Sequence, residues 1–172
     1  MTARKTPPKW ARAQRGAAGI EFAFLFTIFF GVFYAVISYA FVTLLQQGLA
    51  QASAEGARAA VRLDPTQYNA TQALSFQTDT TKVAQDATRK ALSWMPSAVQ
   101  AKLNNAVEVS YTTSKIPLAN GTTLNATDIT VKVTYADYPA DPMLPLITLP
   151  GLGTIPTVPQ NLIGSSTVRI SP

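Results

Sequence analysis

The chain has 172 residues, enough for one membrane helix and one small domain, and it contains neither cysteine nor histidine. These absences exclude disulfides, cysteine nucleophiles, imidazole bases and the usual zinc ligands. The formal net charge of +5 lies in the leader, because nine Lys/Arg and nine Asp/Glu balance from Ala17 onward; the leader cations are Arg4, Lys5, Lys9, Arg12 and Arg15. No basic stripe is left in the rest of the chain, so no nucleic-acid partner is expected.

A long apolar run follows the basic leader. Residues 22–54 include no Asp, Glu, Lys or Arg. Phe22 to Leu45 would form a helix of about 36 Å, which is enough to cross a bilayer. By the positive-inside rule, the leader cations predict a cytoplasmic N-terminus and an external C-terminal domain. One carboxylate, Glu21, directly precedes this apolar run. An unpaired charge at that position in a membrane costs free energy, so its presence indicates a functional role.

The residues around Glu21 form a motif. The segment Arg15-Gly16-Ala17-Ala18-Gly19-Ile20-Glu21-Phe22 resembles the processing site of type IV pilin-like proteins, in which a prepilin peptidase cuts after the glycine and leaves Glu at the fifth mature position. With Gln46-Gln47 and Ala54-Glu55-Gly56-Ala57-Arg58-Ala59-Ala60, the motif looks like the TadE-like minor pseudopilins of tight-adherence (Flp) pilus systems. Beyond Leu63 only the order of elements is similar.

This resemblance implies a minor component of pilus assembly, anchored once in the bacterial inner membrane or incorporated in the pilus. Its N-terminus would be cytoplasmic and its C-terminal domain periplasmic. The implied partners are the membrane, the prepilin peptidase, other pilins or pseudopilins and the pilus secretion machinery. The early span lacks a proline, and Thr27 lies near the place where one is common. TadE and its sister TadF type therefore both stay open.

The resemblance marks Gly16, Ala17, Glu21 and Phe22 as the processing site. Cleavage after Gly16 would create an ammonium at Ala17, about 6 Å along a helix from Glu21, and in low dielectric the two charges would stabilise one another. Other interpretations stay open. Glu21 could merely cap the helix in its first turn, where the macrodipole favours an anion, and the run could be an uncleaved anchor. The small residues of 50–54 could also mark a signal peptidase site.

The helix is expected to continue past the lipid boundary until Pro65, because residues 46–62 are good helix formers and a proline disfavours helix in the residue before it. Small residues recur at every fourth position and indicate helix packing between subunits, unless they only reflect ordinary membrane-helix composition. They are Ala23, Thr27, Gly31 and Ala35, then Gly48, Ala52, Gly56 and Ala60. The predicted organisation is a basic leader (1–16), a transmembrane and extended helix (17–62) and a periplasmic domain (63–172).

The domain is predicted to be α+β. After a polar connector with one short helical turn, a second helix is expected, capped by Asp79 or Thr80 and closed by Pro96. The pattern then alternates, as half-buried strands require, over 107–111, 129–135 and 168–170, with Asn120-Gly121 as a turn signal. The predicted fold is a long N-terminal membrane-spanning helix extended into the periplasm, then one helix on a roughly three-stranded antiparallel sheet.

Residues 138–165 form a different kind of segment. They hold six prolines and three glycines, which exclude a continuous helix or interior strand, yet most of the other residues are apolar. Such a connection is too long for an idle loop in a compact domain. Two possibilities stay open: the segment packs back over the sheet, or it offers an apolar surface to a partner.

No catalytic set can be assembled from the sequence. The acids are scattered singly, without the spacing needed for general acid-base work or a metal, and Ser114-Lys115 would point to opposite sides of a strand. We therefore expect no enzyme, no cofactor and no metal. The leading hypothesis is a pseudopilin that acts in tight-adherence pilus assembly after cleavage. The rival is an uncleaved membrane-tethered periplasmic binding module that uses the Pro-rich segment as its recognition surface.

Overall fold

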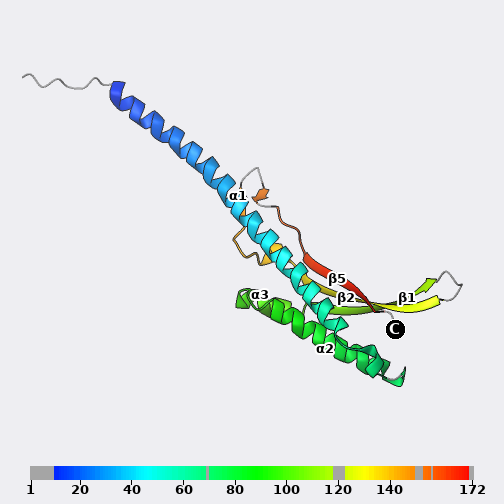
Figure 1. The fold of residues 1–172 in the computed structure, drawn as a ribbon. Coiled ribbons are helices and arrows are strands. Elements are labelled where there is room, and N and C mark those ends of the chain that lie inside the picture. Colours follow the sequence, from blue (N-terminus) through cyan, green and yellow to red (C-terminus); the bar gives the residue numbers. More distant parts are fainter. Residues whose placement is uncertain (1–9, 69, 118–122, 150–152, 156, 171–172) are drawn as a thin grey trace, which may run out of the picture.

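The longest element of the protein is one continuous helix. The structure is a computed structural model that describes residues 10–68, 70–117, 123–149, 153–155 and 157–170. Helix α1 (Trp10–Val61) has 52 residues, and its first part extends away from the other elements (Figure 1). The predicted end before Pro65 is confirmed, because Pro65 already opens the short 3-10 helix η1 (Pro65–Gln67). The helix starts inside the expected leader.

Two further helices follow α1. The 3-10 turn η2 (Ala70–Gln72) leads into α2 (Ala73–Ala91), and α3 (Ser97–Leu103) comes after a short turn. The predicted caps of the second helix are wrong, since α2 begins before Asp79 and Thr80, and Thr80 is buried within it. Pro96 does not close α2; it stands at the N-cap of α3. The sequence pattern does not predict α3, because seven residues are too few to show an apolar period.

Three long strands form one antiparallel sheet in the order β1-β2-β5. Their bounds are β1 (Val107–Pro117), β2 (Thr123–Tyr135) and β5 (Leu162–Ile170). The register places Val107 opposite Val133 and Ile129 opposite Val168, so the alternating apolar residues share one face. The predicted three-stranded sheet and the α+β class are confirmed. The predicted turn at Asn120-Gly121 lies outside the described residues.

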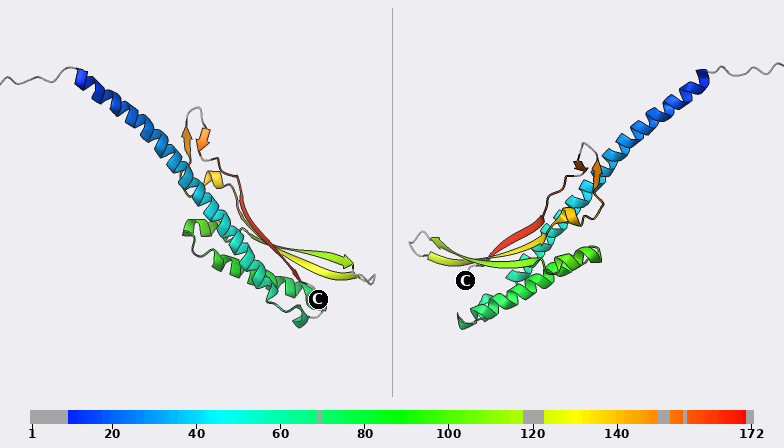
Figure 2. Two further views of the ribbon diagram at one scale, coloured as in Figure 1. Left: turned by 45° about the horizontal axis from the view of Figure 1, so that its top comes forward. Right: turned by 180° about the vertical axis from the view of Figure 1, so that it is seen from behind.

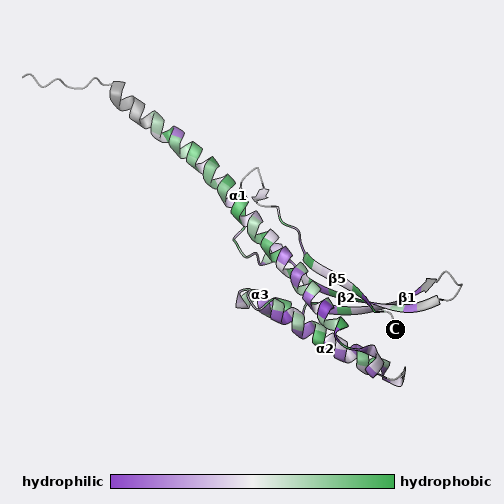
Figure 3. Cartoon of the chain, viewed as in Figure 1, coloured by the Kyte–Doolittle hydropathy of each residue, from purple (hydrophilic) through white to green (hydrophobic). Residues whose placement is uncertain are grey.

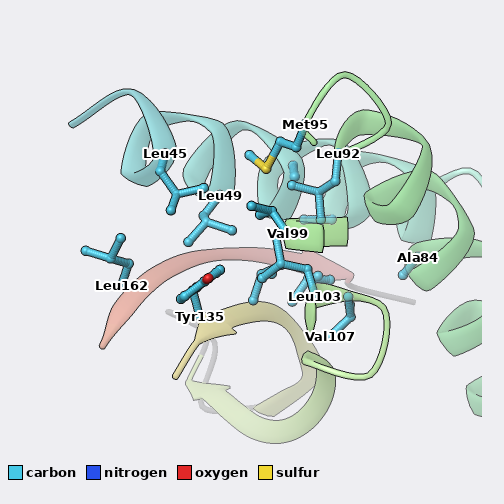
Figure 4. Packing of buried hydrophobic residues seen from close by; sticks show 14 of the residues in the cluster. Leu45, Leu49, Ala84, Leu92, Met95, Val99, Leu103, Val107, Tyr135 and Leu162 are labelled. Atoms are coloured by element: carbon cyan, nitrogen blue, oxygen red, sulfur yellow. The ribbon is translucent and has the colours of Figure 1, made fainter. Parts of the chain in front are cut away.

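The core lies between one face of this sheet and two helices. The C-terminal half of α1 packs against β2 and β5, while α2 lies beside it and reaches β1 (Figures 2 and 4). The largest buried apolar side chains come from α1, β2 and β5, and also from α3 and the turn that carries Tyr138: Leu45, Leu49, Leu103, Ile129, Val131, Val133, Tyr138 and Leu162. The second half of α1 is therefore part of the domain core and not only a stalk.

The outer set of small residues packs within the chain. Gly48, Ala52, Gly56 and Ala60 are all buried. A Cβ atom at Gly56 would overlap the Thr88 hydroxyl of α2 and lie 3.0 Å from the carbonyl oxygen of Ala84. The expected packing between subunits is thus wrong for this set, because it packs within one chain: Gly56 faces α2, and Gly48 faces Trp94 and Met95 in the turn after α2. In the inner set, by contrast, a Cβ at Gly31 would meet nothing within 4 Å.

The Pro-rich segment has two parts. The first consists of its two ends, which pack back on the core: Tyr138, in the 3-10 turn η3 (Tyr138–Ala140), is 2% exposed, and Met143 and, later in the chain, Val158 pack against the same cluster. The second part contains the strands β3 (Ile147–Leu149) and β4 (Gly153–Ile155), which form a separate antiparallel pair. This hairpin, which the sequence pattern does not predict, lies beside α1 (Figures 1 and 2). The expectation that the segment packs back over the sheet therefore holds for its first part alone.

Candidate processing site on the membrane helix

The expected processing site lies on the part of α1 that is farthest from the domain (Figure 1). Gly16 and Ala17 are helical in the full-length chain, in about the second turn after Trp10. Glu21 and Phe22 follow on the exposed helix surface, and Phe22 is 69% exposed. A protease would have to unwind this turn to reach the peptide bond after Gly16. Glycine makes this easier, since it costs a helix about 1 kcal/mol relative to alanine.

The Glu21 carboxylate lies in apolar surroundings. It is the only charged residue between Ala17 and Ala54. Ala17, Ile20, Phe24 and Leu25 surround it on the helix surface. Among the side chains that the structure describes, none forms an ion pair or hydrogen bond with Glu21. The carboxylate of the full-length chain is therefore exposed beside apolar neighbours without a partner in this part of the molecule.

Glu21 does not occupy the first turn of α1. The helix begins at Trp10, about three turns earlier, and its first turn contains no acid. The macrodipole acts mainly within the first turn, so the expectation that it stabilises Glu21 is wrong for the full-length chain. In a chain that began at Ala17, Glu21 would be the fifth residue and would again lie near the positive end of the helix.

An aromatic stripe connects the site with the domain. Phe22, Phe26, Phe30 and Tyr34 follow one another at one-turn spacing, and successive ring centroids are 6.0, 6.2 and 6.4 Å apart. At the end of the stripe, the Tyr34 hydroxyl donates a hydrogen bond to the carbonyl of Pro145. Figure 3 shows that apolar residues dominate the part of α1 that extends away from the domain, and that polar residues gather where α1 meets the domain. This exposed apolar surface needs lipid or another helix to cover it.

In the described part of the chain, one helix is long and apolar enough to cross a membrane, namely residues Ala17–Val61 of α1. The most apolar stretch is not buried inside the molecule, which indicates single-pass anchoring. The outer end of the predicted span, however, packs on the domain: Ser38, Val42 and Leu45 are 4%, 5% and 1% exposed. Residues 17–33, which are all exposed and which we call the bare part of α1, are thus fewer than the residues of the span predicted from composition.

The polar residues of the domain serve its packing and surface. No group of three or more metal-ligating residues occurs in the described ranges. Arg169 donates hydrogen bonds of 2.6 and 2.9 Å to the two oxygens of Asp128, and this contact lowers the pKa of that carboxyl group. Burial raises the pKa of the phenols of Tyr111, Tyr135 and Tyr138, which keeps them protonated. These contacts stabilise the fold and do not converge on one site.

Comparison with known proteins concerns the same helix. The model of the TadE-like protein family matches residues 16–58, from Gly16 of the expected processing site to Arg58 near the end of α1. No curated protein and no solved structure matches the chain. The resemblance inferred from the sequence motif is therefore confirmed for this segment. Over residues 16–58, which include Gly16, Ala17, Glu21 and Phe22, the chain is similar to the TadE-like protein family.

Proposed function

We propose that this chain is a pilin-like minor pseudopilin, which acts in tight-adherence pilus assembly after a prepilin peptidase cleaves it between Gly16 and Ala17. The match to the TadE-like family supports a structural protein associated with the Tad pilus. The observation that carries the finer proposal is the exposed Glu21 carboxylate, which has no partner among the described side chains and lies four residues after Ala17. Cleavage supplies that partner.

Cleavage changes the electrostatics of the helix in two ways. It creates an ammonium at Ala17, about 6 Å along the helix axis from Glu21. In a low dielectric the paired charges avoid much of the cost that each would have alone, whether the amine belongs to the same chain or to a neighbour in the assembly. It also removes the five leader cations that hold the N-terminus on the cytoplasmic side. The mature helix is then free to leave its inserted position.

The bare part of α1 provides the contact surface for assembly. The inner small residues Ala23, Thr27 and Gly31 share this part of the helix with the aromatic stripe, and the open space at Gly31 lets a second helix approach closely. Lipid covers this surface while the chain is anchored in the inner membrane with its domain in the periplasm. Helices of other pilins or pseudopilins cover it once the secretion machinery incorporates the chain in the pilus.

Mass spectrometry of the N-terminus after co-expression with the cognate prepilin peptidase tests this function. We expect the mature chain to begin at Ala17. Gly16→Ala should block cleavage, because it adds bulk at the scissile bond and strengthens the helix that must open. Gly19→Ala is the matched control: it adds the same methyl group to the same helix, in open space and away from the scissile bond.

An intact Met1 or Thr2 would contradict the proposal, provided that the same peptidase preparation cleaves another of its substrates. That result would support the alternative function, an uncleaved membrane-tethered periplasmic binding or interaction module. Cleavage of Gly16→Ala and Gly19→Ala with equal efficiency would place the processing site elsewhere.

A further inference from the structure

The β3–β4 hairpin lies beside the bare part of α1 and not over the main sheet (Figure 2). The hydrogen bond from the Tyr34 hydroxyl to the Pro145 carbonyl holds the loop just before β3 against the helix. Tyr34 lies inside the charge-free run, about 18 Å of helix before Gln46. The hairpin thus reaches back from the domain along the segment that crosses the membrane.

The position of Tyr34 sets the depth of this contact. A hydrocarbon core of about 30 Å takes about 20 helical residues. If the core begins after Glu21, it ends near Phe41, and Tyr34 lies about 10 Å inside its outer edge. The loop that carries Pro145 is therefore at the level of the outer leaflet.

The composition of the segment suits this position. Residues 142–168 contain no Asp, Glu, Lys or Arg. Leu144 and Leu146 are half-buried, and Ile147 at the start of β3 is 37% exposed. The face of α1 that carries Val36 and Tyr39 also exposes apolar surface near this level of the helix. Apolar surface on the hairpin and on the helix favours a lipid environment over water.

The backbone of the hairpin limits how deep it can lie. In the described structure β3 and β4 pair with each other alone, so their outer edges carry unpaired N–H and C=O groups. Such groups are not tolerated facing lipid in the hydrocarbon core, but at the headgroup boundary they reach water. Since the contact lies about 10 Å inside the edge of an undeformed core, the outer leaflet must be thinner by about this distance next to the hairpin, and such mismatch costs fractions of a kcal/mol per Å.

We propose that the β3–β4 hairpin inserts into the outer leaflet of the membrane, at the boundary between headgroups and acyl chains, and that lipid is its partner. The hairpin then acts as a second membrane contact next to α1 and fixes how far the domain stands from the bilayer. This inference needs a membrane-anchored chain but does not depend on cleavage after Gly16.

The absence of cysteine allows a direct test, because any introduced cysteine is unique. Thr148→Cys and Thr154→Cys place a label on the exposed strands of the hairpin, and Thr112→Cys on exposed β1 is the control. Each full-length variant is labelled with the fluorophore NBD and reconstituted in phosphatidylcholine and phosphatidylglycerol vesicles. Quenching is then measured with aqueous iodide and with lipids that carry a nitroxide near the headgroup or at the chain end.

At positions 148 and 154 we expect a blue-shifted emission, a loss of most iodide quenching, and stronger quenching by the shallow nitroxide than by the deep one. At position 112 we expect iodide quenching alone. Equal iodide quenching at all three positions, without nitroxide quenching, would overturn the proposal. Stronger quenching by the deep nitroxide would place the hairpin among the acyl chains and would overturn its proposed position at the headgroup boundary. If the protection of NBD from iodide disappears when the lipid-to-protein ratio is raised, the proposal is also overturned, and a second copy of the chain is identified as the partner.

Discussion

Gly164 of β5 lies directly against the backbone of Leu49 in α1. A Cβ atom at position 164 would overlap the carbonyl carbon and oxygen of Leu49 and lie 2.6 Å from the amide nitrogen of Ala50. Backbone atoms inside a helix cannot move aside as a side chain can. The absence of a side chain at this one position therefore lets the strand and the helix approach closely enough to close the core.

We predict that Gly164→Ala destabilises the domain. Overpacking of this kind costs about 1–3 kcal/mol, and each kcal/mol lowers the Tm by about 2–4 °C for a chain of this size. Thermal unfolding of the detergent-solubilised chain measures the effect. Ser165→Ala is the control, because Ser165 is the exposed neighbour on the same strand. A Tm for Gly164→Ala equal to that of the control would show that α1 and β5 are not in such close contact.

Substitution by alanine should lower the Tm at one glycine of α1 and not at another. Gly56→Ala should lower the Tm, because its Cβ would press on the Ala84 carbonyl at 3.0 Å and on Val131 at 3.1 Å. Gly31→Ala should not lower it, since the position is open and alanine favours a helix by about 1 kcal/mol. An equal decrease in Tm in both variants would mean that the general effect of alanine on the helix, and not the contact of α1 with α2, dominates at Gly56.

The pair between Asp128 and Arg169 should contribute to stability in a pH-dependent way. Arg169 lowers the pKa of Asp128 below its ordinary value of 3.8. The contribution is therefore fully present above that value and is lost as the pH falls through the lower folded-state pKa. The Tm advantage of the native chain over Asp128→Asn should be constant near neutral pH and shrink below about pH 4.

The control for this experiment is Asp86→Asn, whose carboxylate is 77% exposed and lies 3.5 Å from Arg89. Its difference from the native chain should be small, as it is for most exposed ion pairs. A Tm difference for Asp128→Asn that stays the same from neutral to acidic pH would contradict the proposed charge pairing.

Glu21→Gln tests the pairing of the carboxylate with the new amine, because it keeps the shape of the side chain and removes its charge. The variant should insert and be cleaved almost normally, since an uncharged amide is less costly in lipid than a carboxylate. Pilus assembly should then fail. Piliation is measured by microscopy in a strain that lacks the native gene, and normal piliation by the variant would rule out the amine-pairing mechanism.

Much of this protein could be predicted from local sequence. The charge-free run after Glu21 indicates a membrane helix, Pro65 marks where the helix must end, and the alternation around Val131 marks a half-buried strand. The processing motif could be recognised because it is a contiguous segment. Such features depend on neighbours in the sequence, so they need no knowledge of the fold.

The start of α2 and the presence of α3 could not be predicted in the same way. Asp79 and Thr80 are good capping residues, yet α2 begins earlier, at Ala73, and Thr80 is buried in its interior. The packing of this helix on α1 and the sheet outweighs the local preference for a cap. That Glu21 lies on the long helix could be predicted from the sequence, whereas its position outside the first turn depended on where α1 begins.

By itself, the sequence determined the helix that carries Gly16, Ala17, Glu21 and Phe22, and it determined the alternating pattern of the sheet. Only the tertiary structure decided which small residues are used inside the chain, because Gly48 and Ala23 have the same local character. It also decided that the hairpin lies beside Tyr34, a contact with Pro145 that joins residues far apart in the chain. The physical reason is that periodicity shows which face of an element is apolar, while the partner of that face depends on how distant elements pack.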